Sequence, residues 1–119
     1  EFCDRLGYGM CLDLSHAWLH CTHYGLDYLD YLRTVAPLTR HLHIADGRGS
    51  HKEGLQIGEG DVPFAEAFAV LAECLPRDIE VSWVPEIWQG HIHDYRQFRI
   101  ALAKLAAYPF LSEGILQRA

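Results

Sequence analysis

The chain has 119 residues, of which 50% are hydrophobic, and this is enough apolar material to bury a core in one globular unit. Its 16 acidic residues against 10 Lys and Arg give a formal net charge of -6, and the basic residues are scattered, which argues against a nucleic-acid-binding surface. The apolar runs are short and interrupted, so we expect a cytoplasmic protein without a membrane segment.

The hydrophobic pattern alternates short strand-like runs with longer amphipathic stretches, which is typical of βα units that build a parallel sheet. Residues 1–6 resemble the end of an earlier helix. The first unit then comprises a strand over Met10–Asp13, a polar loop, and a helix over about 27–35 with apolar residues at helical spacing. Pro37 closes this helix.

The second unit follows the same order. It has a strand over about 41–44, a glycine-rich loop over 46–61, and a helix over about 63–75. Asp61 is the expected N-cap of this helix, and Pro63 lies in its first turn, where the missing N–H of proline is tolerated.

The third unit has a strand over about 79–84 and a helix over about 94–108, which ends before Pro109. Linkers, low-complexity tracts and charge blocks are absent from the sequence. We therefore expect a single α/β domain, or part of one, with three βα units and parallel strands.

Each predicted strand ends in a residue that can bind a metal ion: Asp13 in CLDLSH, His43 in HLHIAD and Glu86 in WVPEIW. The carboxyl ends of parallel strands meet at one edge of the sheet, so we expect these side chains to converge there. Two carboxylates and an imidazole suit Mn²⁺, Mg²⁺ or Co²⁺, and Zn²⁺ also fits. In the structural alternative, Asp13 begins a turn, His43 is a hydrogen-bonded strand histidine, and Glu86 is a loop carboxylate.

His16 follows Asp13 closely enough to join the same site, as a partner of a ligand, a substrate donor or a ligand to a further ion. A separate small zinc site is the alternative, formed by His16, His20, Cys21 and His23. The spacing of these residues matches no common zinc pattern. Four cysteines, Cys3, Cys11, Cys21 and Cys74, have no close-paired spacing, so we expect free thiols.

The loop GRGSHKEGLQIGEGD is rich in glycine, which lets a backbone approach a ligand or adopt positive φ. Its spacing matches neither a Walker loop nor a dinucleotide-binding fingerprint, so nucleotide binding is not expected. Within it, Arg48, His51 and Glu53 are candidates to contact a substrate, as is His91 beyond Glu86. The alternative is that all of them are solvated loop residues.

Taken together, these motifs resemble the xylose-isomerase-like superfamily, which includes sugar phosphate isomerases and epimerases, ketose 3-epimerases and phosphodiesterases of the endonuclease-IV type. The resemblance covers nearly the whole chain and rests on LDLSH, on HLHIADGRG running into EGLQIGEGDVPF, and on PEIWQGH, in that order. It implies that residues 1–119 are the C-terminal portion of a single (β/α)8 TIM barrel.

In that family a divalent metal ion is held by Glu, Asp, His and Glu from the last four strands, and Asp13, His43 and Glu86 match the last three. The resemblance also implies that Glu86 is a catalytic base and that His16 contacts the substrate. The implied reaction is isomerisation or epimerisation of a sugar or sugar phosphate by proton transfer through an enediolate, with a hydride shift as the alternative.

The first glutamate of that set has no counterpart here, because its strand would precede residue 1. We therefore expect the chain alone to be inactive and to associate with itself or with the missing N-terminal half of a barrel. A non-catalytic carbohydrate-binding or assembly part-barrel is the main alternative. An endonuclease-IV-like phosphodiesterase would need an Asp and a His just before IGEG, where this chain reads EGLQ.

Overall fold

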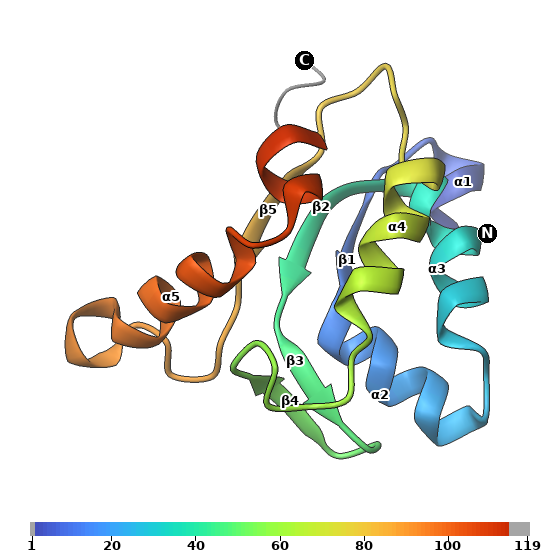
Figure 1. The fold of residues 1–119 in the computed structure, drawn as a ribbon. Coiled ribbons are helices and arrows are strands. Elements are labelled where there is room, and N and C mark those ends of the chain that lie inside the picture. Colours follow the sequence, from blue (N-terminus) through green and yellow to red (C-terminus); the bar gives the residue numbers. More distant parts are fainter. Residues whose placement is uncertain (1, 115–119) are drawn as a thin grey trace.

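The computed structural model describes residues 2–114 and shows a mixed α/β protein with a main sheet of three parallel strands in the order β1-β2-β5 (Figure 1). These strands are β1 (Met10–Asp13), β2 (Thr39–Ile44) and β5 (Ser82–Pro85). The three predicted strands are thus confirmed, although β2 begins earlier and β5 begins later than the apolar pattern suggested. Neighbours in sequence order are also neighbours in the sheet, which is the usual result of successive βα units.

Helices α2 (Leu14–Tyr24), α3 (Tyr28–Val35) and α4 (Phe64–Cys74) lie on one side of β1 and β2, and α5 (Ile92–Leu105) runs beside β5 (Figure 1). Short helical turns complete the described chain: α1 (Phe2–Leu6), η1 (Ala36–Leu38) and η2 (Phe110–Gly114). The helix expected over residues 1–6 corresponds to α1, with residue 1 outside the described residues. As predicted, α3 ends just before Pro37.

The core lies between the helices and one face of the sheet. Leu12, Leu42 and Ile44 of the strands are almost fully buried there, together with Leu32 of α3 and Leu71 of α4. Because side chains alternate along a strand, the residues between these leucines and isoleucines point to the opposite face.

That opposite face, called here the open face, carries Cys11, His41, His43, Ser82 and Val84. Cys11 is exposed, and even the apolar Val84 keeps 42% of its surface accessible. Among residues 2–114, no strand pairs with the outer edge of β1 or of β5. The main sheet therefore has one covered face, one open face and two unpaired edges in the described part of the chain.

The segment between β1 and α3, which we expected to be a polar loop, forms helix α2, and this prediction was wrong. Asp13 caps the helix by accepting a hydrogen bond from the backbone N–H of His16 at 2.8 Å. Gly25 ends it with a φ of 65°, a left-handed conformation that glycine adopts without strain. The helix buries Leu14, Ser15, Ala17 and Cys21 against the core. This packing outweighs the polar residues that made the segment resemble a loop.

The glycine-rich loop contains an antiparallel hairpin that the sequence did not indicate, formed by β3 (Asp46–Arg48) and β4 (Lys52–Leu55). The expected N-cap role of Asp61 was also wrong. Helix α4 begins after Pro63 without a side-chain cap, whereas a carboxylate oxygen of Asp61 accepts a hydrogen bond from the N–H of Gly49 at 3.0 Å. Asp61 thus closes the loop instead of starting the helix.

Helix α5 begins earlier and ends earlier than the range 94–108 that we predicted. His93, Asp94 and Tyr95 have φ values of 52°, 59° and 58°, so the regular right-handed helix starts only after them. All four cysteines lie in the described part of the chain and have free thiols, as predicted. Within residues 2–114, no helix is both long enough and apolar enough to cross a membrane.

Candidate functional site

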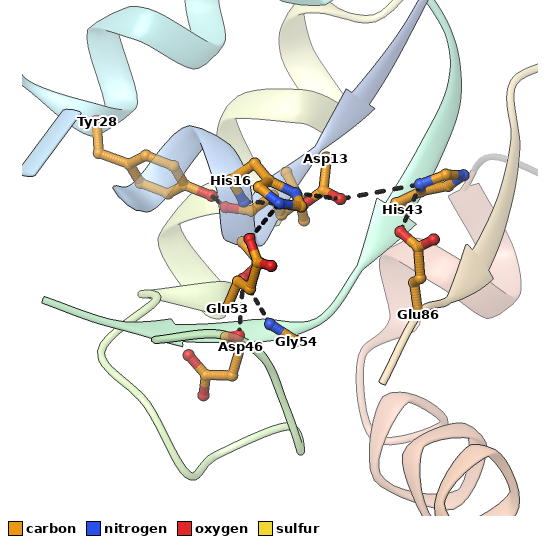
Figure 2. Close-up of polar contacts among 10 residues, drawn as sticks. Asp13, His16, Tyr28, His43, Asp46, Glu53, Gly54 and Glu86 are labelled. Carbon is orange, nitrogen blue, oxygen red and sulfur yellow. Dashed lines mark hydrogen bonds and ion pairs between the residues drawn. The ribbon is translucent and has the colours of Figure 1, made fainter. Parts of the chain in front are cut away.

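Three potential metal ligands meet at the carboxyl ends of the parallel strands (Figure 2). Asp13 ends β1, His43 lies beside it in β2, and Glu86 follows β5 directly, where its N–H donates to the carbonyl of Ile44 at 3.0 Å. One ligand atom from each of the three lies within 4.8 Å of those of the other two. The expected convergence of these side chains is therefore observed.

His43 stands between the two carboxylates. Its Nδ1 is 2.6 Å from Oε2 of Glu86 and 3.8 Å from Oδ2 of Asp13. The side chains of Asp13 and His43 are mostly buried, with 19% and 31% of their surface exposed. Two carboxylates and one imidazole fit a hard or intermediate divalent cation, which would replace the direct contact between His43 and Glu86. The assignment of a metal ion to this cluster stays a prediction.

His16 connects this cluster to the hairpin. Its Nδ1 is 2.8 Å from Oδ2 of Asp13, and its Nε2 forms an ion pair with Glu53 of β4 (Figure 2). The hydrogen bond to Asp13 is the main cause that raises the pKa of His16, and the negative charges of Asp13 and Glu53 add to it, whereas partial burial opposes it. The structure thus places His16 and Glu53, both predicted substrate contacts, in one chain of polar contacts with Asp13.

The titration of His16 gives a first test of this arrangement. In the metal-free protein we expect NMR titration to give His16 a pKa above the ordinary value of 6.5. A pKa raised by folding contributes stability that is fully present below the unfolded pKa and is lost as the pH rises through the folded pKa. Asp13→Asn should lower the pKa of His16 more than Glu53→Gln does, because the bond to Asp13 is the largest cause. The reverse order would contradict the contacts described.

A cavity of about 390 Å³ opens beside the cluster. Five of the predicted site residues line it: Asp13, His16, Glu53, Glu86 and His91. Trp88 and Phe98 add apolar surface to its wall. Arg48 does not line this cavity; its guanidinium donates a hydrogen bond to the carbonyl oxygen of Glu59 within the glycine-rich loop. Of the predicted substrate contacts, the structure therefore brings His16, Glu53 and His91 to the cavity and holds Arg48 elsewhere.

Two loops are tied together at the edge of this cavity. The N–H of Trp88 donates to the carbonyl oxygen of Gly54 at 2.8 Å, which joins the segment after β5 to the hairpin. Gly54 has a φ of 66°, and a Cβ added there would lie 3.3 Å from Trp88, so the position favours glycine on both counts. The glycine permits the close approach that shapes the cavity.

Sequence reasoning missed two buried polar residues that position the hairpin. The hydroxyl of Ser15 donates to the carbonyl oxygen of Asp46 at 2.9 Å and accepts from the N–H of Gly54 at 3.1 Å, which fixes the hairpin to α2. The available signal was the position of Ser15 beside Leu14 in a stretch with helical spacing, which would have placed the hydroxyl on a buried face.

The second missed residue is Asp46, whose side chain organises the glycine-rich loop. It is 1% exposed, and its carboxylate accepts four backbone hydrogen bonds of 2.8 to 3.0 Å. The donors are the N–H groups of Gly47, Gly58, Gly60 and Val62. A Cβ at position 60 would overlap the carbonyl oxygen of Gly47, so this close wrapping of the loop requires glycine there.

Comparisons with protein-family models, with curated protein sequences and with solved structures found no match to this chain.

Proposed function

We propose that the cluster of Asp13, His43 and Glu86 holds a divalent metal ion in an isomerase or epimerase that acts on a sugar. The observation that carries this proposal is the convergence of the three side chains from three parallel strands beside a cavity of about 390 Å³. In open parallel sheets and in closed barrels alike, substrates bind at the carboxyl ends of the strands. The cavity is also lined by groups that can hydrogen-bond to hydroxyls.

We further propose that the three strands belong to a (β/α)8 barrel of the xylose-isomerase-like kind. The parallel order β1-β2-β5 and the polar, uncovered open face both support this, since the open face would be the barrel interior. Further strands would pair with the outer edges of β1 and β5, supplied either by another copy of the chain or by an N-terminal barrel half. Unpaired edges favour such pairing, because their N–H and C=O groups lack partners.

A divalent ion at this cluster would polarise the substrate's carbonyl and hydroxyl oxygens. Glu86 is the proposed base because it lines the cavity and is the most exposed of the three, at 52%. Its carboxylate would remove the proton from the carbon next to the carbonyl; the C–H electron pair then forms the C=C bond of an enediolate. Return of the proton to the former carbonyl carbon, with transfer of the hydroxyl proton from one oxygen to the other, gives an isomer. An epimer forms only when a second acid, which the strands that complete the barrel would have to supply, returns a proton to the opposite face of the same carbon.

The charge of the cavity bears on the substrate class. Asp13, Glu53 and Glu86 contribute carboxylates to its wall, and no Lys or Arg of the described residues lines it. A phosphate group placed there would meet like charges, which weakens binding, whereas sugar hydroxyls can donate hydrogen bonds to carboxylates. We therefore favour an unphosphorylated sugar over a sugar phosphate.

Metal titration of the chelator-treated protein tests the proposal. We expect Mn²⁺ to bind, measured by calorimetry, and Glu86→Gln and Asp13→Asn each to weaken this binding by more than about tenfold, because each removes a charged ligand. Glu66→Gln, the same substitution at an exposed position of α4, is the matched control and should leave binding unchanged.

The same samples decide between an enzyme and a binding module. Once further strands pair with the outer edges of β1 and β5, an isomerisation assay should detect metal-dependent turnover. Turnover of ketoses should exceed turnover of ketose phosphates. A carbohydrate-binding part-barrel would give a different result. Its affinity for the sugar would be the same with and without metal, and Glu86→Gln would not change its affinity for Mn²⁺.

A further inference from the structure

A second group of potential metal ligands lies on the open face, one step further from the strand ends than Asp13 and Glu86. Cys11 of β1 pairs with His41 of β2 in the parallel register, and His43 lies two residues beyond His41 on the same face. One ligand atom from each of these three residues lies within 4.8 Å of those of the other two. Neighbouring strands thus bring a thiol and two imidazoles together.

Both histidine rings are held by contacts through Nδ1. Nδ1 of His41 is 2.7 Å from the hydroxyl oxygen of Ser82, the residue of β5 that pairs with His41. Nδ1 of His43 is 2.6 Å from a carboxylate oxygen of Glu86. The two rings also meet edge to face, with centroids 5.1 Å apart. A hydrogen bond at one ring nitrogen fixes the orientation of a histidine and leaves the other nitrogen to a metal, which is the usual arrangement in metal proteins. When Nδ1 carries the proton and donates in these contacts, Nε2 is the ring nitrogen that can bind a metal ion.

We propose that Cys11, His41 and His43 form a second metal site, one that prefers Zn²⁺, Co²⁺ or another cation that binds thiolate and imidazole. Its donor set contains sulfur and nitrogen without a carboxylate. The metal preference therefore differs from that of the cluster of Asp13, His43 and Glu86, whose carboxylates suit Mn²⁺ or Mg²⁺. Three protein ligands leave a fourth position of a tetrahedral ion for water or a small ligand. The two sites share His43, so occupation of one affects the other.

The location of Cys11 supports a ligand role. In contrast to Cys21, which is 1% exposed and packs in the core, Cys11 is exposed on the open face beside polar neighbours. Nδ1 of His41 likewise contacts a neutral side chain, the hydroxyl of Ser82.

Co²⁺ is the probe of choice, because a cobalt–thiolate bond gives a charge-transfer absorption that oxygen and nitrogen ligands do not. The chelator-treated full chain is reduced, kept without oxygen and titrated with Co²⁺ alone. We expect a thiolate-to-cobalt band that Zn²⁺ abolishes by displacement. Cys11→Ser should remove the band, and His41→Gln should weaken Co²⁺ binding by at least about tenfold, as expected for a lost ligand.

Two controls keep this result distinct from the proposed function. Cys74→Ser removes a thiol of α4, outside the open face, and should keep the band. Asp13→Asn should keep the band while it weakens Mn²⁺ binding, so the two metal sites can fail separately. Circular dichroism confirms that each variant is folded. A folded wild-type chain without a thiolate band, or a band that persists in Cys11→Ser, would overturn the second site.

Discussion

Asp46→Ala is expected to destabilise the protein by about 3 to 5 kcal/mol, because a buried acceptor disappears and its donors lose their partners. The carboxylate accepts hydrogen bonds from four backbone N–H groups of the glycine-rich loop. Hydrogen bonds to a charged group contribute more than neutral ones, and each N–H left unsatisfied in a buried place adds a desolvation cost. Asp46→Asn should also destabilise, since an amide has one acceptor oxygen where the carboxylate has two.

Urea unfolding measures this effect as a lower midpoint with an unchanged slope. Asp61→Ala is the matched control, because Asp61 is an exposed aspartate of the same loop that accepts a hydrogen bond from Gly49. Asp61→Ala should lower the free energy of unfolding by less than about 1 kcal/mol, the range of a single exposed hydrogen bond. Equal losses for the two variants would show that Asp46 does not organise the loop.

If the completed barrel is the sugar isomerase proposed above, Glu86→Gln is expected to lower its turnover by about 10²- to 10⁴-fold, because the amide keeps the shape of the carboxylate but cannot accept the proton. Binding of the sugar should change far less, since a base that acts on the reacting proton contributes mainly to the transition state. The exposed side chain at the cavity wall allows contact with a substrate without movement of the backbone.

The assay must separate the two roles proposed for Glu86. Turnover is therefore measured at saturating Mn²⁺, with the metal content of each sample determined, and Glu66→Gln serves as the matched control. Turnover close to that of the unaltered chain, with metal bound, would remove Glu86 as the base. A loss of turnover fully explained by lost metal would leave Glu86 as a ligand only.

Local sequence patterns were sufficient for the parts of the fold that depend on local chemistry. The strand over Met10–Asp13 and the end of α3 before Pro37 were predicted correctly. The spacing of apolar residues and the helix-ending effect of proline both depend only on residues close together in the sequence. The convergence of Asp13, His43 and Glu86 also followed, since parallel strands place their carboxyl ends at one edge. These expectations needed only the order and type of the elements.

Contacts between distant residues decided what the sequence left open. Helix α2 forms where we expected a loop, because Leu14, Ala17 and Cys21 pack in the core and Asp13 caps the helix. The loop after β2 is shaped by Asp46, whose donors lie as far as 16 residues away, and by Ser15 from another element, 39 residues from Gly54.

The sequence by itself therefore determined the parallel strands and the meeting of Asp13, His43 and Glu86 at the strand ends, through periodicity and strand direction. Only the tertiary structure decided which polar groups are buried together. It showed Asp46 to be a structural anchor and Asp61 a loop contact, and it placed Arg48 away from the cavity that Glu53 lines. The physical reason is that a hydrogen-bond acceptor takes whichever donor the folded chain brings within about 3 Å, and spacing along the chain does not record that distance.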